Sequence, residues 1–433
     1  MLRPDTIALT ALLALLTAFG PVATDMYIPS MPDIGRSLDA SALAVQLTLS
    51  AYLVAFAAGQ VIYGPISDRY GRKPVLLAAL ALFCTASLAC ALASSIEMLI
   101  AARALQALGG CGAIVLPRAI VRDLYAGERA GRELSRMGAI MSFAPVIAPL
   151  IGAVVQAELG WQANFLIIVA AGLAATVVAW RSLPETLQHR PAARISFAST
   201  LQSYRAIIAH RAFLAHLGIV ACSYAGLFAW ISGSPFVLQN LYGLSPIGFG
   251  IAFAGASLGS VTGGAVATSL VTRVGLDRTI GLGTLALAVG GLAMVAGQAL
   301  EFAPIASLVL SMVVYQIGLM LALPQAIAGA MTPFPDRAGT ASSLVGVTQQ
   351  ISAAALGTAV GHAAGYSAWP LAGAVAAMGC LSFLFWAASR RLRAEGAHLS
   401  ALSLATIVAP RPGGLPFEST VDQRLSAVAN TGR

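Results

Sequence analysis

Charged residues are scarce in this sequence of 433 residues: only 10% are Asp, Glu, Lys or Arg. Soluble domains contain about 25% charged residues, because water must solvate their surface. Apolar residues make up 58% of the chain, and the mean hydropathy is +0.82. A surface with so little charge would aggregate in water, so the composition predicts that lipid surrounds most of the chain.

Residues that carry metal, redox or nucleotide chemistry are also few. The five cysteines lie in apolar stretches without metal-ligand spacing, so we expect them to pack as small hydrophobic side chains. The sequence lacks the phosphate-binding pattern Gly-x-x-x-x-Gly-Lys-Ser/Thr, which excludes a nucleotide-driven pump of that class. Without clustered His, Asp and Glu or a nucleophile–base pair, we predict no enzyme, no metal and no cofactor. The cysteines are Cys84, Cys90, Cys111, Cys222 and Cys380.

Long apolar stretches are abundant by contrast. A helix needs about 20 apolar residues to cross about 30 Å of hydrocarbon, and twelve stretches meet this requirement. The first is not expected to be a cleavable signal peptide, because its apolar run is long and only Arg3 precedes it. The sequence therefore predicts an all-α membrane protein with spans at 7–29, 43–64, 74–93, 96–118, 135–157, 162–180, 212–236, 246–270, 279–299, 304–331, 338–361 and 368–389.

The positive charge is distributed unevenly between the two sides of the predicted bundle. The chain has 25 basic residues, of which Lys73 is the only lysine, and a net charge of +8. With a cytoplasmic N-terminus, the external loops contain only Arg36, and Arg103 lies within the fourth span. Because basic loops stay in the cytoplasm, we predict that both termini are cytoplasmic. The charge is then a topology signal, and we expect no nucleic-acid partner.

The central hydrophilic stretch separates six spans from six. Asp68-Arg69-Tyr70-Gly71-Arg72 after the second span is echoed by Thr272-Arg273-Val274-Gly275-Leu276 after the eighth, at a constant offset of 204. Parallel six-helix repeats with a substrate site between them are a major transporter architecture. We predict a six-helix half at 1–180, a cytoplasmic loop at 181–211, a second half at 212–393 and a disordered cytoplasmic tail at 394–433.

The segment after the second span carries the most specific pattern. It reads Gly64-Pro65-Ile66-Ser67-Asp68-Arg69-Tyr70-Gly71-Arg72-Lys73 and resembles the signature of the major facilitator superfamily, Gly-x-x-x-Asp-Arg-x-Gly-Arg-Arg/Lys. The resemblance implies a conformational latch between the half-bundles, with Asp123 as the acidic partner of Arg72. Thr272 replaces the aspartate in the second half, so any latch is asymmetric. The alternative is a basic turn that only anchors the topology.

Two ionisable residues are predicted inside the bilayer. Arg103 in the fourth span lies roughly 10 Å below the surface by helical rise, where an unpartnered arginine costs several kcal/mol; Arg118 is expected to reach the cytoplasmic interface. Arg103, followed by Gln106, resembles the arginine that proton-coupled drug exporters use for proton transfer. Asp25 ends the first span at a similar depth, so the pair is our candidate for proton coupling. The alternatives are an arginine that binds helix carbonyls and an aspartate exposed to the external medium.

The fifth span contains two prolines among small residues. Ala144-Pro145-Val146-Ile147-Ala148-Pro149-Leu150-Ile151-Gly152 resembles the antiporter motif Gly-Pro-x-x-Gly-Pro/Gly of the superfamily, with alanine in place of two glycines. The resemblance implies export, whereas the alternative is a kinked packing helix. Together with Asp-Met-Tyr-x-Pro in the first span and Arg-Asp-Leu-Tyr at 122–125, it resembles the bicyclomycin-resistance and chloramphenicol-efflux branch of the drug:proton antiporters.

The family fold implies that the first, fourth, seventh and tenth spans line the substrate path. Each candidate substrate-cavity residue on them is also compatible with ordinary helix packing. We expect a monomer in the bacterial cytoplasmic membrane that exchanges protons for drugs or related small molecules. A proton-coupled importer, a dedicated metabolite exporter and a non-transporting membrane sensor remain alternatives. Beyond the coupling pair, the latch and the antiporter motif, the candidate substrate-cavity residues are Tyr27, Gln106, Trp230, Ser234, Tyr315, Gln316 and Gln325.

Overall fold

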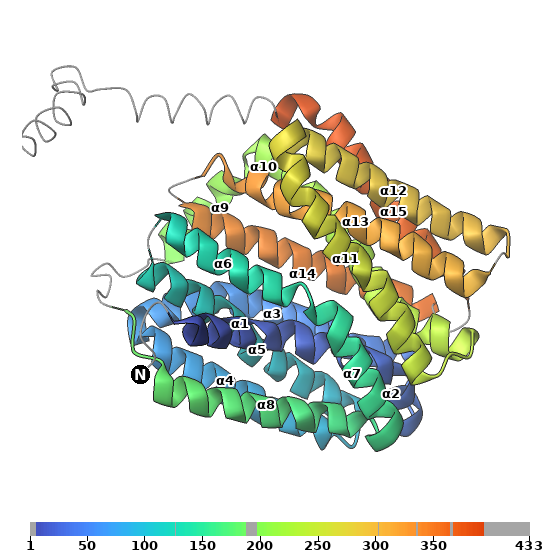
Figure 1. Cartoon of the computed structure of the whole chain (residues 1–433), viewed down its shortest axis with the longest axis horizontal. Coiled ribbons are helices and arrows are strands. Elements are labelled where there is room, and N and C mark those ends of the chain that lie inside the picture. Colours follow the sequence, from blue (N-terminus) through green and yellow to red (C-terminus); the bar gives the residue numbers. More distant parts are fainter. Residues whose placement is uncertain are drawn as a thin grey trace, which may run out of the picture.

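The computed structural model describes residues 6–125, 127–187, 197–301, 303–334, 337–363 and 367–393. Long helices lie side by side across Figure 1, and all regular secondary structure in these ranges is helical. The predicted tail at 394–433 and residues 188–196 of the predicted central loop lie outside the described residues.

The elements of the first half are α1 to α8 with one short 3₁₀ turn, η1. Serine side chains cap three of the longest helices of the whole chain: Ser41, Ser95 and Ser245 each accept from the backbone amide three residues on, at 3.1–3.3 Å. The bounds are α1 Ile7–Asp25, η1 Ile28–Ser30, α2 Met31–Ser37, α3 Ala42–Tyr70, α4 Arg72–Ala91, α5 Ile96–Leu124, α6 Gly127–Met141, α7 Ala144–Leu159 and α8 Trp161–Ser182.

The second half begins after a surface helix, α9 (Phe197–Ile208), that lies within the predicted central loop. Its remaining bounds are α10 Arg211–Pro235, the π-helical turn η2 Phe236–Leu241, α11 Pro246–Val274, α12 Leu276–Ala299, α13 Pro304–Met331, α14 Ala338–Ala363 and α15 Trp369–Ala388.

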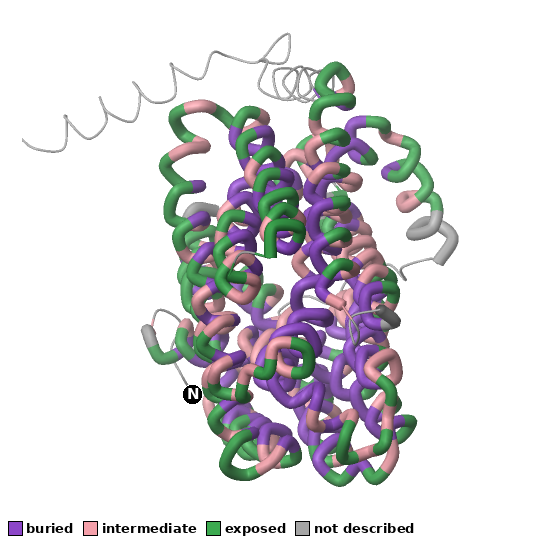
Figure 2. The backbone as a smooth tube through the Cα atoms, turned by 90° about the vertical axis from the view of Figure 1, so that its right-hand side faces the viewer, coloured by how far each residue is buried: buried purple, intermediate pink, exposed green. Residues whose placement is uncertain are grey.

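The prediction of an all-α protein with twelve spans is confirmed. Within the described residues, eleven helical segments are long and apolar enough to cross a membrane. The twelfth, α14, has 26 residues and packs between α3 and α10. Exposed Leu, Ile and Val side chains such as Leu105, Leu258 and Leu384 lie on the outer surface, and Figure 2 shows buried residues concentrated where helices meet. Such a surface suits a lipid environment.

Three predicted spans are interrupted in the structure. The first continues beyond Asp25 through η1 into α2, the fifth is divided into α6 and α7 at Ser142–Phe143, and the seventh ends in the π-helical η2 after Pro235. Proline accounts for these breaks, because it removes a backbone donor and crowds the preceding turn. Apolar length alone predicts the spans but not these interruptions.

The helical bundle has two ends, a terminal face that carries both ends of the described chain and an opposite face. The terminal face carries the start of α1 and the end of α15, and the opposite face carries α2 and the turn at Gly160. Gly71 (φ +104°) joins α3 to α4 at the terminal face, and Gly275 (φ +86°) joins α11 to α12 in the same way. These glycines differ by the predicted offset of 204 residues, so the two helix pairs have equivalent connections.

The two halves contact each other mainly through α3 with α14 and α7 with α11. Gln46 Nε2 donates to Ser232 O at 2.9 Å, and Gln239 Nε2 donates to Pro29 O at 3.0 Å. Ser50 Oγ contacts the second half as well, through Ala354 O and Thr358 Oγ1 at 3.2 and 2.8 Å. All of these residues lie in the parts of their helices that lead to the opposite face, so that face is closed.

Candidate functional site

The signature segment is mostly helix in the structure. Gly64 to Tyr70 form the last two turns of α3, and Gly71 alone makes the turn into α4. Its φ of +104° is unfavourable for residues with a β-carbon. A β-carbon on Gly64 would meet no atom within 4 Å, so the two signature glycines have different surroundings. The tight turn is shorter than the sequence pattern suggests.

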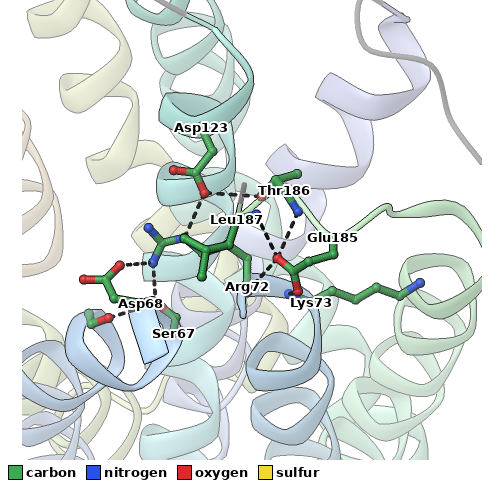
Figure 3. Close-up of polar contacts among 9 residues, drawn as sticks. Ser67, Asp68, Arg72, Lys73, Asp123, Glu185, Thr186 and Leu187 are labelled. Carbon is green, nitrogen blue, oxygen red and sulfur yellow. Dashed lines mark hydrogen bonds and ion pairs between the residues drawn. The ribbon is translucent and has the colours of Figure 1, made fainter. Parts of the chain in front are cut away.

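Arg72 is the centre of the polar network at this turn, which is drawn in Figure 3. Its guanidinium contacts Asp68 Oδ1 at 2.6 Å and Asp123 Oδ2 at 2.8 Å, and it donates to Ser67 Oγ at 2.6 Å. The Arg72–Asp123 pair implied by the family resemblance is therefore present. It joins the end of α5 to the turn between α3 and α4.

Glu185 extends the network in a way that the sequence analysis missed. It follows α8, and its carboxylate accepts hydrogen bonds from the backbone amides of Arg72 at 2.9 Å and Lys73 at 3.2 Å. It therefore caps the first turn of α4 from a distant segment, a role usually taken by the residue just before a helix. Figure 3 shows Glu185 beside the start of α4.

The loop around Glu185 is ordered by the same carboxylate. The amides of Thr186 and Leu187 donate to Glu185 Oε1 at 2.9 and 3.0 Å, and Thr186 Oγ1 donates to Asp123 Oδ2 at 3.3 Å. Burial alone would raise the pKa of Glu185, but the four backbone donors hold its pKa below its usual value. The sequence did contain a signal for Glu185: it is an acidic residue directly after the sixth span, on a face of the bundle that is rich in arginine.

Arg69 and Lys73 take no part in the ion pairs of this network among the described residues. The Arg69 guanidinium lies over the Tyr70 ring at 5.2 Å from its centroid, and both residues are exposed. Lys73 contributes its backbone amide to Glu185. The network therefore depends on Arg72, Asp68, Asp123 and Glu185, which connect the ends of α3, α5 and α8 to the start of α4.

The second half has a different connection at the equivalent position. Arg393 Nε donates to Asp277 Oδ1 at 2.8 Å, which joins the segment after α15 to the first turn of α12. Trp386 Nε1 donates to Asp277 O at 3.2 Å and lies beside the Arg393 guanidinium. The expected asymmetry is present in the structure: the signature aspartate is replaced by Thr272, and Asp277 supplies the acid.

Arg103 is fully buried in α5 and is surrounded by aromatic rings. Its guanidinium carbon lies 4.5 Å from the ring centroid of Tyr27 and 4.4 Å from that of Tyr52, with Phe165 at 5.9 Å. Such cation–π contacts stabilise a desolvated cation by about 2 kcal/mol. Tyr27, a predicted substrate-cavity residue, therefore lines the arginine site, and its hydroxyl contacts Thr48 Oγ1 at 2.6 Å.

The hydrogen bonds of Arg103 are made to neutral oxygens. Nη1 donates to Ala23 O at 3.1 Å and to Gln106 Oε1 at 2.5 Å, and Gln106 Nε2 donates to Ser87 Oγ at 2.8 Å. Nε and Nη2 have no partner among the described residues. The bond to Ala23 O is the helix-carbonyl contact that the sequence analysis kept as an alternative, and Gln106 positions the arginine.

Asp25 ends α1 two residues after Ala23. It is 7% exposed, which disagrees with an aspartate open to the external medium. No hydrogen bond or ion pair of its carboxylate is found within the described residues. Arg103 therefore does not pair with Asp25, and bonds instead to the carbonyl of Ala23, two residues earlier. Tyr52 of α3 and Tyr224 of α10 lie within electrostatic range of Asp25. The carboxylate thus lies where the two halves meet.

The proline segment of the fifth span lies against both α1 and α11. A β-carbon on Gly152 would lie 2.3 Å from Met26 O, directly after Asp25. Pro149 O lies 3.3 Å from the β-position of Gly250 in α11. Pro145 stands in the first turn of α7, after the break that follows α6. Small residues therefore permit close contact between α7 and two helices, one from each half; Ala144 and Ala148 are the other small residues of the segment.

The candidate cavity residues of the second half do not form one cluster. Tyr315 is fully buried and donates to Ser223 O at 3.2 Å, while Gln316 accepts from Ser260. These two are engaged within their own half. Gln325 lies next to Pro324 in the part of α13 near the terminal face and is half-buried. Tyr315 and Gln316 therefore have structural partners already.

Trp230 and Ser234 share one face of α10, four residues apart. Trp230 stacks on Phe253 of α11, with ring centroids 6.4 Å apart. Trp230 Nε1 and Ser234 Oγ are buried and lack hydrogen-bond partners among the described residues. Buried polar atoms without partners are costly, so these two remain the best-supported substrate-contact candidates in the second half.

Comparison with known proteins identifies a family and several similar proteins. The sequence profile described as Major Facilitator Superfamily matches residues 13–358. An uncharacterized MFS-type transporter, YdgK of Bacillus subtilis (strain 168), is 33% identical over 348 residues, covering 79% of this chain and 86% of the relative. A chloramphenicol resistance protein of Pseudomonas aeruginosa is 30% identical, covering 78% and 80%. The multidrug resistance protein D of Escherichia coli (strain K12) is 32% identical, covering 82% and 89%. A D-xylose–proton symporter structure matches with a TM-score of 0.69 at 15% identity, covering 88% of this chain and 97% of that one.

Proposed function

The chain belongs to the major facilitator superfamily and is a membrane transporter, not an enzyme; from this premise we propose that it exports drugs or related small molecules in exchange for protons. Relatives at about 30% identity are named for chloramphenicol and multidrug resistance, which supports export at the level of the family. The observation that carries the proton-coupling part is the isolated carboxylate of Asp25, buried where the halves meet.

Alternating access follows from the arrangement of contacts between the halves. In this conformation Gln46, Ser50 and Gln239 hold the opposite face closed. Opening that face requires these hydrogen bonds to break and the halves to rock about the substrate site. The network around Arg72 fixes the helix ends of the first half at the terminal face, so that this half moves as one body.

Asp25 is the proton site in this proposal. A carboxylate outside water holds a proton more readily than one in water, so its charge state responds to whether the opposite face is open. Protons that enter from that side neutralise Asp25 when it is exposed and leave when the halves rearrange. Arg103 supports the site by holding the Ala23 carbonyl, two residues from Asp25.

The proline segment of α7 supports the export direction. Gly152 packs on the backbone of Met26, and Pro149 packs on Gly250 of α11. A rigid, small-residue contact between α1, α7 and α11 seals the path beside Asp25 and prevents a leak of protons without substrate. We assign the terminal face to the cytoplasm because the basic residues gather there.

We also propose that the protein is a monomer in the bacterial cytoplasmic membrane. Its proposed segments are the first six-helix half at 1–180, the cytoplasmic loop at 181–211, the second half at 212–393 and the cytoplasmic tail at 394–433.

Transport in everted membrane vesicles tests the proposal. An established pH gradient, reported by a quenched acridine dye, is challenged with chloramphenicol and with a panel of unrelated antibiotics. We expect at least one compound to dissipate the gradient in vesicles that contain the wild-type protein. Asp25→Asn is expected to abolish the response, because a side-chain amide neither binds nor releases a proton near neutral pH.

The control is Asp39→Asn, which changes an exposed aspartate at φ +47°, a conformation that asparagine adopts readily. It should respond like the wild type. A gradient that dissipates equally with Asp25→Asn would remove Asp25 from the coupling mechanism, and a gradient that no compound dissipates would refute drug:proton exchange.

A further inference from the structure

Arg118 of α5 lies close to the end of its helix at the terminal face. Six residues, roughly 9 Å of helical rise, separate it from the end of α5, and its position at the cytoplasmic interface stays a prediction. Its guanidinium is within electrostatic range of the Cys111 thiol, which is two turns further into the bundle. Arg122, one turn nearer the terminal face, lies within the same range.

The face of α5 that carries Arg118 lies between α1 and α3 of the first half. Cys111 and Ile114 precede Arg118 by seven and four residues and so lie on the same face. Cys111 belongs to the apolar cluster that is built largely from α10, α11, α13 and α14, and Ile114 packs against that cluster. On one side Cys111 contacts Gly59 of α3, and on the other Ile114 contacts Gly20 of α1. Arg118 thus points between α1 and α3.

Arg118 is accessible although several apolar residues next to it in α5 are buried. Arg118 is exposed, whereas Leu116, Ile120 and Val121 are each at most 1% exposed and Pro117 is buried. Within the described residues, no carboxylate pairs with Arg118, and the other charged group in its range is the cation Arg122. An accessible arginine without an acidic partner is a candidate for binding an anion.

We propose that Arg118 binds the negatively charged group of the substrate, and that the preferred substrates are amphipathic organic anions with a carboxylate. This rests on the proposed transport function. The guanidinium offers a planar pair of donors that matches a carboxylate. Ile114, Val115 and Tyr63 are partly buried apolar neighbours on the same side of the first half, and they supply a surface for the apolar part of the substrate.

Charge elsewhere in the first half supports this choice. Three acids near the terminal face have cationic partners: Asp68 and Asp123 pair with Arg72, and Glu133 pairs with Arg136. The carboxylate of Glu185 is taken up by four backbone amides. Arg118 and Arg122 have no acidic partner among the described residues. The space beside them therefore has a positive potential, which attracts anions and repels cations.

Direct binding to the purified full-length protein tests the inference. The probes are carboxyfluorescein, an anion, and rhodamine 6G, a cation with a related xanthene ring, and binding is read by fluorescence anisotropy. We expect saturable binding with a preference for carboxyfluorescein. Arg118→Gln should weaken that binding by about tenfold or more, and Arg118→Lys should restore part of it. Arg132→Gln, which removes an exposed arginine of α6, should change binding by less than about twofold.

Each contrary result overturns the inference. These results are the absence of saturable carboxyfluorescein binding, a wild-type preference for rhodamine 6G, and unchanged carboxyfluorescein affinity in Arg118→Gln. The proposed function fails separately: if no compound exchanges for protons in vesicles while Arg118-dependent anion binding persists, proton-coupled export is wrong and the anion site remains. If compounds do exchange for protons but Arg118→Gln leaves carboxyfluorescein binding unchanged, the anion site is wrong and proton-coupled export remains.

Discussion

Gly71 and Glu185 fit against each other so closely that a β-carbon on Gly71 would lie 2.5 Å from Oε2 of Glu185. The glycine is thus needed for two separate reasons, its positive φ and the carboxylate that occupies the space beside it. Glu185 in turn caps the start of α4 from a position 113 residues away from Arg72. The turn and the segment after α8 therefore form one structural unit.

Gly71→Ala should disrupt this unit. At φ +104° and ψ 154° the backbone of Gly71 is in a region essentially restricted to glycine, which costs a residue with a β-carbon about 1–3 kcal/mol. The methyl group also displaces Glu185 from the amides of α4. We expect a lower melting temperature and weaker transport. In a double-mutant cycle with Glu185→Gln, the two losses should be less than additive, because either change breaks the same contact. Full additivity in thermal unfolding would contradict the coupling.

Glu185→Gln should destabilise the protein at neutral pH by on the order of 1 kcal/mol, as expected for loss of a helix cap. Because the pKa of Glu185 is lowered in the folded state, its carboxylate stabilises the fold above the usual value of 4.5. That contribution disappears as the pH falls through the lowered value. The melting curves of variant and wild type should therefore converge in acid. The control is Glu158→Gln, an exposed glutamate of α7, for which we expect no pH-dependent difference.

Asp123→Asn should weaken the network at the terminal face. The change removes a charged acceptor from Arg72 Nε, in a pair whose side chains are only 11% and 21% exposed. Hydrogen bonds between such charged groups contribute about 1.5–3 kcal/mol, so transport in vesicles should fall about tenfold or more. Asp39→Asn provides the comparison, because Asp39 is exposed and its positive φ suits asparagine. Equal loss in both variants would argue against a special role for Asp123.

Gly152→Ala should impair coupling more than overall folding. The added methyl group would meet Met26 O at 2.3 Å, so α1 must shift beside Asp25; such overpacking costs on the order of 1–3 kcal/mol. We expect faster passive proton leak in vesicles and poorer substrate exchange. Gly138→Ala in α6 is the matched control, since its β-position has no atom within 4 Å, and it should be neutral or slightly stabilising. A leak-free Gly152→Ala would refute the sealing role of this contact.

Gln46→Leu and Gln239→Leu should favour opening of the opposite face. Each removes one hydrogen bond between the halves, worth about 1 kcal/mol net, which shifts the balance of conformations about fivefold. Spin labels at Leu92 and Leu300, which are 65% and 75% exposed, report the separation of the halves by pulsed electron resonance. Gln298→Leu is the control, because Gln298 binds Tyr242 within one half. An unchanged distance distribution in both interface variants would contradict the predicted gate.

The sequence predicted what depends on local composition. Apolar length identified the twelve spans, and the pattern from Gly64 to Lys73 identified the turn where Arg72 meets Asp123. It did not predict that this segment is mostly helical, because α3 extends beyond hydrocarbon length to Tyr70. It also missed Glu185, since a carboxylate 113 residues from Arg72 has no local signature of its contact.

Side-chain direction was the least predictable property. Counting residues placed Arg103 and Asp25 at similar depths, but the arginine turns toward Ala23 O and the rings of Tyr27 and Tyr52. Helical rise gives depth along an axis, whereas the partner of a buried group depends on the rotation and tilt of every neighbouring helix. The same limitation applies to Arg118, whose depth was estimated without the face on which it lies.

Lys73 is the only lysine in the sequence, and its backbone amide is held by Glu185 at the start of α4. Its ε-amine is therefore the only side-chain amine available to an amine-reactive reagent, the α-amino group of the chain being the other reactive amine. With the α-amino group blocked first near neutral pH, a single fluorophore on Lys73 would sit beside Arg72 and Glu185 without any engineered cysteine. The protein thus carries its own unique side-chain labelling position, from which an environment-sensitive dye can follow the terminal face during turnover in real time.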